Sequence, residues 1–280
     1  MSRFRLLAID IDGTLVNSQN ELTNATRTAL LRAKLAGIEI VLATGRRYSR
    51  VLPLVEPLEL NVPLVTASGA LIKQASDHAT LFRAEFAPGA LARCLQLVSA
   101  AGFEAVLYAD TYEQGFDFYC SSRAPNEPLL HEFLQKNEGF EQIVPRLMAD
   151  PPANIFAGFA MGTRDEMVVL KGVLQKNLPQ HLEVHVLRSP RYQGFMCEIA
   201  PCGVSKWTGI RHLAEQWGIE AEAICAVGDD VNDIPMIAAA GLGVAMENAL
   251  DEVKAAADRI APGHDHDGLV QVVDWLLESS

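Results

Sequence analysis

The sequence has no apolar stretch long enough to cross a membrane. Its most apolar late segment, residues 236–246, is about half the length of a bilayer-spanning helix and is rich in glycine and alanine. Near the amino terminus, Asp10 interrupts an apolar run that is too short for the hydrophobic region of a signal peptide. These absences predict a cytoplasmic protein that does not enter a membrane.

Positive charge and paired-cysteine patterns are also scarce. The 280 residues carry 23 Lys and Arg against 35 Asp and Glu, which gives a formal net charge of −12. Such a surface repels phosphate backbones, which excludes nucleic acid as a general partner. An anionic small substrate would need a metal ion or a few well-placed cations. The five cysteines are odd in number and lack C-x-x-C spacing, so we expect reduced core thiols rather than disulfides.

Alternating strand and helix patterns occupy both ends of the chain. The hydrophobic content of 49% is typical of a globular protein, and the length allows one large domain or two smaller ones. We expect strands at residues 4–10, 38–43, 63–67, 223–227 and 242–245, with helices at 23–36, 47–58, 204–217, 234–240, 250–257 and 268–277. This alternation predicts an α/β fold with a doubly wound, mainly parallel sheet.

The middle of the chain follows a different pattern. After Ser68, Gly69 and Ala70, a hairpin-type exit leads into paired strand patterns and separate helical segments with their own apolar faces. This arrangement is typical of an α+β domain inserted into another domain. We therefore predict a core of residues 1–83 and 190–280, interrupted by a cap domain of residues 84–189.

The most informative fragment is Asp10, Ile11, Asp12, Gly13 and Thr14, at the end of the first predicted strand. If the run is a strand, both acids point to the same side, because alternate residues of a strand share a face. Two adjacent anions raise each other's pKa unless a cation or hydrogen bonds intervene. The alternative is an ordinary Asp-Gly turn with a solvated acid beside it, and this fragment alone does not decide between them.

Three further fragments lie near predicted strand ends or at a helix start. They are Thr44 with Gly45 and Arg46, Lys206 near the start of a helix, and the acidic run from Gly228 to Asp233. Each alone has an unremarkable alternative, such as a polar turn or an exposed helix lysine. However, ligands of an open α/β sheet bind at the carboxyl ends of its strands. We therefore expect three of the four fragments to meet at that edge.

The four fragments, in this order, resemble the motifs of the haloacid dehalogenase (HAD) superfamily of phosphotransferases. More narrowly, the chain is similar to the Cof-type phosphatases, which carry a large α/β cap of the C2 type between the second and third motifs. The resemblance spans nearly the whole chain. It departs from the family at Ser68, where relatives usually carry Asn, and at Trp207, where Gly is common.

The resemblance implies roles for the acids. Asp10 would be the nucleophile that forms an aspartyl-phosphate, and Asp12 would be the general acid and then the general base. The metal ligands would be Asp10, the main-chain carbonyl of Asp12, and Asp229, with Mg²⁺ as the ion. Asp233 and, with weaker support, Asp230 would hold the groups around the ion.

The resemblance also implies a phosphate-binding set, made of Thr44, Gly45, Lys206 and Asn232. Two roles stay open for Arg46, which are a contact with substrate and a pair with an acid near the cap. The run from His264 to Asp267 looks like a metal cluster, but we interpret it as a polar loop in which Asp267 caps the following helix.

The expected activity is Mg²⁺-dependent hydrolysis of small phosphorylated metabolites, with sugar phosphates first and phosphorylated cofactors next. The cap would select the leaving group. Two alternatives stay open. One is a phosphomutase that returns the phosphoryl group to a sugar, and the other is a non-catalytic ligand-binding protein on the same fold. The oligomeric state cannot be read from the sequence.

Overall fold

A computed structural model describes residues 3–58, 61–188 and 192–278. The chain divides into two compact units, Met1–Phe82 with Ser205–Ser280 and Arg83–Val204. The exit from the first unit thus lies within one residue of the expected position. The expected return between residues 189 and 190 lies outside the described residues, and the chain rejoins the first unit at Ser205. The return comes after the expected position because strand β11 (Phe195–Pro201) still pairs with strands of the second unit.

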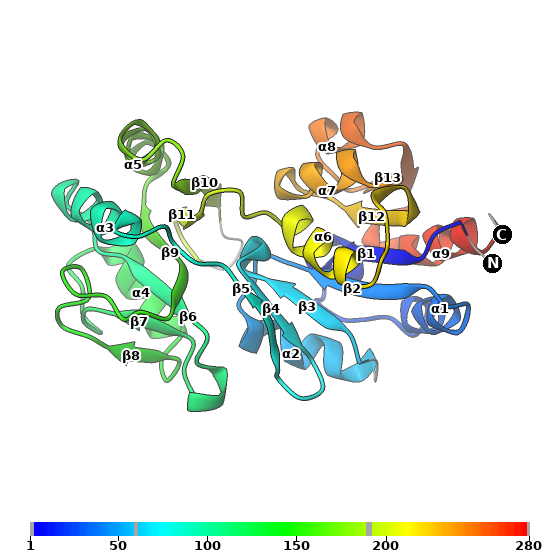
Figure 1. The fold of residues 1–280 in the computed structure, drawn as a ribbon, viewed down its shortest axis with the longest axis horizontal. Helices are drawn as coiled ribbons and strands as arrows, with labels where there is room; N and C mark the ends of the chain where they lie inside the picture. Colours follow the sequence, from blue (N-terminus) through cyan, green and yellow to red (C-terminus); the bar gives the residue numbers. More distant parts are fainter. Residues whose placement is uncertain (1–2, 59–60, 189–191, 279–280) are drawn as a thin grey trace. The chain divides into compact units, whose positions relative to one another are not determined.

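The first unit contains an eight-stranded sheet in the order β14-β13-β12-β1-β2-β3-β4-β5 (Figure 1). Strands β14 to β3 in that order are parallel, and β4 runs antiparallel to β3. The mainly parallel α/β fold is confirmed. The strand bounds are Leu6–Asp10 (β1), Glu39–Ala43 (β2), Pro63–Thr66 (β3), Leu71–Gln74 (β4), Thr80–Arg83 (β5), Ile224–Gly228 (β12), Leu242–Met246 (β13) and Arg259–Ala261 (β14).

Helices cover both faces of this sheet. Alternate residues such as Leu6 and Ala8 pack with apolar side chains of α6 (Lys206–Gln216), α7 (Ile234–Ala239) and α8 (Asp251–Ala256). The intervening residues Leu7 and Ile9 are also fully buried. Helices α1 (Asn24–Leu35) and α9 (Gly268–Glu278) contact each other, and α2 spans Tyr48–Val55. Burial of every β1 side chain explains why the strand is an uninterrupted apolar run up to Asp10.

The second unit contains a six-stranded sheet in the order β10-β11-β9-β6-β7-β8. It is antiparallel apart from the β7–β8 pair. Helices α3 and α5 pack on one apolar cluster, and the rings of Phe118, Phe133 and Phe159 join α4 to the strands. The bounds are Val106–Ala109 (β6), Phe118–Cys120 (β7), Glu141–Ile143 (β8), Ile155–Gly162 (β9), Leu182–Arg188 (β10), Phe195–Pro201 (β11), Ala90–Ala100 (α3), Pro128–Lys136 (α4) and Arg164–Asn177 (α5).

The cysteines were expected to be reduced thiols in the protein core. All five cysteines are free, and four are buried, but Cys202 is exposed, so the expectation of core thiols is wrong there. Cys202 lies in the turn after β11, where the sheet no longer covers it.

Among residues 3–58, 61–188 and 192–278, no helix combines the length and the hydropathy needed to span a membrane.

Candidate active site

The site is built around the carboxyl end of β1. Asp10 is the last residue of that strand and is buried, with Ala43 of β2 as its register partner. On the other side, Ile9 pairs with Val227 of β12. Residues that follow β2 and β12 therefore reach the same edge as Asp10, as parallel strands require. This register brings the first, second and fourth sequence fragments to one edge of the sheet.

Asp12 does not share a strand face with Asp10, so that expectation is wrong. Strand β1 ends at Asp10, and residues 11–15 form a tight helical turn in which Asp12 is extended and Gly13 has a φ of 75°. Asp10 is buried, whereas the side chain of Asp12 is 50% exposed. The strand therefore ends two residues before Asp12, and the rule for alternate strand residues does not reach that side chain.

Lys206 joins the third fragment to the other motifs. Ser205 caps helix α6 by accepting from the Thr208 amide, so the helix begins at Lys206. The Lys206 ammonium lies 2.6 Å from Oδ1 of Asp10 and 2.7 Å from Oδ1 of Asp233. Its side chain is buried, which rules out the alternative of an exposed helix lysine. The ammonium thus neutralises one charge inside a group of acids.

A glycine lets α6 approach so closely. A Cβ on Gly69 would lie 2.0 Å from the carbonyl oxygen of Ser205, and the φ of Gly69 is +105°. Any side chain there would push the start of α6, and Lys206 with it, away from the sheet edge. The preceding Ser68 also has a positive φ of 56°, a conformation in which Asn is the more usual residue.

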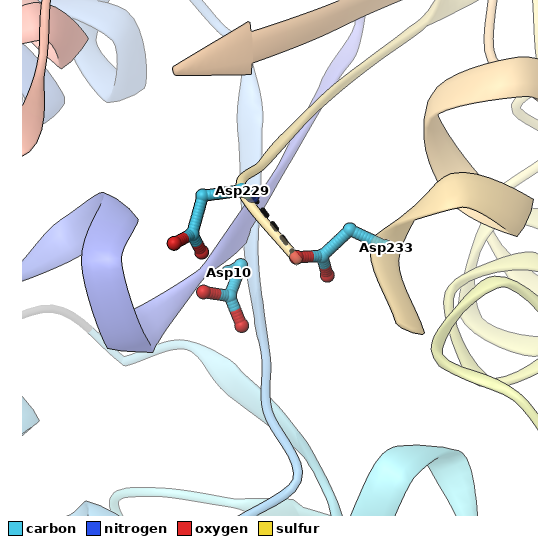
Figure 2. Close-up of side chains that lie close together, drawn as sticks. All are labelled: Asp10, Asp229 and Asp233. Carbon is cyan, nitrogen blue, oxygen red and sulfur yellow. Dashed lines mark hydrogen bonds between the residues drawn. The ribbon is translucent and has the colours of Figure 1, made fainter. Parts of the chain in front are cut away.

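The acidic run after β12 supplies two more carboxylates. Asp233 is fully buried, and its Oδ2 accepts hydrogen bonds of 3.1 Å from the amides of both Asp229 and Asp230. Figure 2 shows Asp233 aimed at the Asp229 backbone, while the Asp229 and Asp10 carboxylates lie next to each other. Oxygen atoms of Asp10, Asp229 and Asp233 all lie within 4.8 Å of one another.

Burial and mutual repulsion act on these acids. Burial, followed by the charges of Asp233 and Asp229, raises the pKa of Asp10 against the opposing effect of Lys206. The same causes, with Asp233 and Asp230 as the charges, raise the pKa of Asp229 to about 7. Burial disfavours the Lys206 ammonium, but Asp10 and Asp233 outweigh it and raise its pKa. Three carboxylates lie near one ammonium, so full ionisation of the acids would leave an excess of negative charge.

The group fits a divalent cation of the hard, oxygen-binding kind. Asp10 and Asp229 are its best-suited ligands, because their carboxylates lie next to each other (Figure 2), with oxygen atoms within 4.8 Å. Asp233 is less suited as a direct ligand, since Lys206 and two backbone amides already engage its oxygens. The Asp12 carboxylate is not in the group, because it pairs with Arg46.

The remaining predicted residues surround this group. Thr44 is buried, and its Oγ1 accepts from the Arg46 amide at 3.0 Å. Asn232 accepts from Lys206 at 3.1 Å, and a Cβ on Gly45 would lie 3.9 Å from the Asn232 amide nitrogen. Asp230 is exposed and accepts from the adjacent Val231 amide, so it belongs to the turn rather than to the cluster.

Two contacts to Asp229 come from residues that we did not predict. Asn248 Nδ2 donates to the Gly13 carbonyl at 2.9 Å and to Asp229 Oδ2 at 3.3 Å. Thr14 Oγ1 lies 3.5 Å from the other Asp229 oxygen. Asn248 follows β13 by two residues, so extending the strand-end rule to the next parallel strand would have found it.

Comparison with known proteins places this geometry in a family. The family model of haloacid dehalogenase-like hydrolases matches residues 7–273. The 5-amino-6-(5-phospho-D-ribitylamino)uracil phosphatase YwtE of Bacillus subtilis is 29% identical, covering 98% of both chains. The pyridoxal phosphate phosphatase YbhA of Escherichia coli is also 29% identical, over 96% of this chain and 97% of its own length.

Comparison with solved structures finds the same family. A haloacid dehalogenase-like hydrolase from Bacteroides thetaiotaomicron is 25% identical, with a TM-score of 0.78 over 97% of this chain and 99% of its own. The match spans both compact units, so it includes the insert as well as the sheet that carries Asp10. With its motif order, its sheet and this near-complete match, the chain belongs to the haloacid dehalogenase-like hydrolases.

Proposed function

We propose that this protein is a Mg²⁺-dependent phosphatase that releases phosphate from small phosphorylated metabolites through an aspartyl-phosphate. The observation that carries the proposal is the buried group of Asp10, Asp229 and Asp233 with Lys206 in contact. A carboxylate beside a fixed ammonium and a metal-ligating acid suits attack on a phosphoryl group, because repulsion between the two anions is reduced.

The residues divide the reaction between them. Asp10 attacks phosphorus, and the ester oxygen leaves with a proton from Asp12. Asp12, now ionised, takes a proton from the water that hydrolyses the Asp10 phosphoester, which releases phosphate and restores both acids. Lys206, the Thr44 hydroxyl, the Gly45 amide and Asn232 bind the phosphoryl oxygens.

The bound ion would be held by Asp10, Asp229 and the main-chain carbonyl of Asp12, with Asp233 fixing the loop that carries Asp229. Mg²⁺ at that place supplies positive charge that offsets the negative charge of the phosphoryl group. The gathering of three carboxylates beside a single ammonium supports this assignment.

The proposed substrates are phosphate esters of primary alcohols, with sugar phosphates first and phosphorylated cofactors next. The two relatives named above support this class, since a phospho-ribityl group and pyridoxal phosphate are both esters of that kind. The free cysteines support a cytoplasmic location, and the net charge of −12 opposes a nucleic-acid partner.

The test is phosphate release from sugar phosphates, nucleotides and phosphorylated cofactors, with and without Mg²⁺ and with Asp10→Asn as the matched blank. We expect metal-dependent release that the variant lacks. Phosphorus NMR of the sugar phosphates separates the mutase alternative, because a mutase moves the group without releasing it. Release that survives Asp10→Asn would refute the covalent route, and binding without turnover would favour the non-catalytic alternative.

A further inference from the structure

One guanidinium holds both carboxylate oxygens of Asp12. Arg46 donates from Nε to Asp12 Oδ2 at 2.7 Å and from Nη2 to Asp12 Oδ1. The Arg46 side chain is only 10% exposed, whereas that of Asp12 is 50% exposed. A planar fork that donates twice fixes the orientation of a carboxylate as well as its position, which a single hydrogen bond does not.

Arg46 is itself held on two sides. Its amide donates to Thr44 Oγ1, and its Nη2 donates to Asn20 Oδ1 at 2.7 Å. Asn20 has a φ of 62° and lies in a tight turn, where Asn17 Oδ1 accepts from the amides of Gln19 and Glu21. A turn that costs conformational strain and is tied internally presents the Asn20 amide to Arg46 in one place.

The run from His264 to Asp267 fastens that turn. Asp265 accepts from the Ser18 amide at 2.8 Å and from the Ser18 hydroxyl at 2.6 Å. Asp267, which we expected to cap α9, accepts from the Thr23 hydroxyl at 2.5 Å. The acidic run therefore clamps the segment on both sides of Asn20, which gives it a purpose that needs no metal ion.

We propose that Arg46, supported by Asn20, is a positioning residue for Asp12 and not a contact to the phosphoryl group. This inference rests on the proposed function, in which Asp12 protonates the leaving oxygen. The fork holds the ionised carboxylate, and in the acid form the proton would occupy a lone pair of one Asp12 oxygen on the side away from Arg46. A half-exposed Asp side chain next to the turn at Gly13 has free torsions, and the fork removes that freedom. The fork uses Nε and Nη2 of Arg46, so a contact with substrate through these two atoms would have to release the pair that now fixes Asp12.

The experiment compares two substrates by kcat/KM, which reports only the steps through departure of the first leaving group. A primary alkyl phosphate needs a proton on its leaving oxygen, whereas para-nitrophenyl phosphate loses a stable phenolate without one. Arg46→Gln should lower kcat/KM for the alkyl ester about 100-fold, as the loss of a general acid does, and leave the aryl ester nearly unchanged. Arg46→Lys should recover only part of the lost kcat/KM for the alkyl ester, because an ammonium cannot form the two parallel hydrogen bonds of a guanidinium.

Three further variants sharpen the comparison. Asn20→Ala should lower the ratio of kcat/KM for the alkyl ester to kcat/KM for the aryl ester, but by less than Arg46→Gln does. Asp12→Asn should reproduce the Arg46→Gln pattern, and the double variant should lose no more than Asp12→Asn alone, because both changes remove one interaction. Arg32→Gln, which removes an exposed pair with Asp274 on the same unit, is the matched control and should change neither substrate.

The contrary outcomes are distinct. An equal loss for both esters would assign Arg46 to the phosphoryl group and overturn the positioning role. The positioning role would also be overturned if the losses of kcat/KM from Arg46→Gln and Asp12→Asn added fully in the double variant. It would be overturned as well if Arg46→Gln lowered kcat/KM for neither ester. If the unmodified protein released phosphate from neither ester, the phosphatase proposal itself would fail, and the positioning role with it.

Discussion

The ammonium of Lys206 lies 2.6 Å from Oδ1 of Asp10, although 196 positions separate the two residues. We predict that Lys206→Met lowers phosphate release by roughly 100- to 1,000-fold, as the loss of one fixed donor does. It should also destabilise the metal-free protein by about 3–5 kcal/mol, because Asp10 and Asp233 lose the cation between them. Urea unfolding monitored by circular dichroism measures this change.

The matched control is Lys34→Met, which removes an exposed ion pair with Glu39 in the same unit. It should cost less than about 1 kcal/mol and leave turnover intact. Equal urea midpoints for Lys206→Met and the unmodified protein would show that the buried pair contributes nothing to stability.

Gly13 is predicted to be intolerant of any side chain. A Cβ there would lie 2.2 Å from Asp229 Oδ2, so Gly13→Ala should displace the proposed metal ligand and weaken Mg²⁺ binding at least tenfold in calorimetric titration. Gly37 shares a positive φ, but a Cβ there meets nothing within 4 Å. Gly37→Ala should therefore cost only about 1–2 kcal/mol of conformational strain and keep its Mg²⁺ affinity. Equal Mg²⁺ affinity in the two variants would contradict the predicted collision.

Mg²⁺ should stabilise the protein more at pH 8 than at pH 6. The pKa of Asp229 in the folded, metal-free protein is raised to about 7 from an ordinary value of 3.8. An acid whose pKa is raised in the folded state contributes stability that is fully present below pH 3.8 and is lost as the pH rises through 7. At pH 8 the ion relieves that loss, whereas at pH 6 it must first displace a proton.

Differential scanning fluorimetry with Mg²⁺ or EDTA at both pH values measures the shift in melting temperature, and Asp229→Asn is the control. The variant should show a smaller shift, and that shift should differ less between the two pH values because only Asp10 still titrates among the two acidic ligands. A shift in the unmodified protein that is larger at pH 6 would remove Asp229 from the ligand set. Chelation by EDTA should also abolish phosphate release.

Thiol reagents should modify one cysteine rapidly in the native protein. Cys202 is exposed, whereas burial raises the pKa of Cys94, Cys120 and Cys197 to about 12 and that of Cys225 further still. Because the thiolate is the reactive form, these four should react only after unfolding. Mass spectrometry after brief iodoacetamide treatment should find one adduct, and none in Cys202→Ser. An adduct on Cys94 or Cys197 in the native protein would contradict their burial.

The sheet and the meeting of motifs were predictable because both follow from local patterns. Buried parallel strands appear as continuous apolar runs, and the rule that their carboxyl ends share one edge brings Asp10, Thr44 and Asp229 together without any knowledge of loops. The Lys206 contact needed more than this rule. A lysine at a helix start is ordinary by itself, and only the close approach allowed by Gly69 carries it to Asp10.

The sequence predicted less well wherever a turn or a distant strand pair decides the outcome. The side chain of Asp12 diverges from that of Asp10 because β1 ends at Asp10, two residues short of Asp12. The return to the first unit depends on how β11 pairs with β9, a contact between segments far apart in the chain. Arg46 was ambiguous because the composition of a turn does not say which neighbour a guanidinium meets.

The central place of β1 has a consequence for synthesis. One edge of β1 pairs with β2, which follows soon after it, but the other pairs with β12, where Leu6 aligns with Ile224. At about 5–20 residues per second, the ribosome needs roughly 10–40 s to make the chain between these partners. During that interval the nascent sheet carries an open, fully apolar edge, which is a template for pairing with other chains. Assembly of this protein therefore depends on protection of that edge until its last fifth emerges.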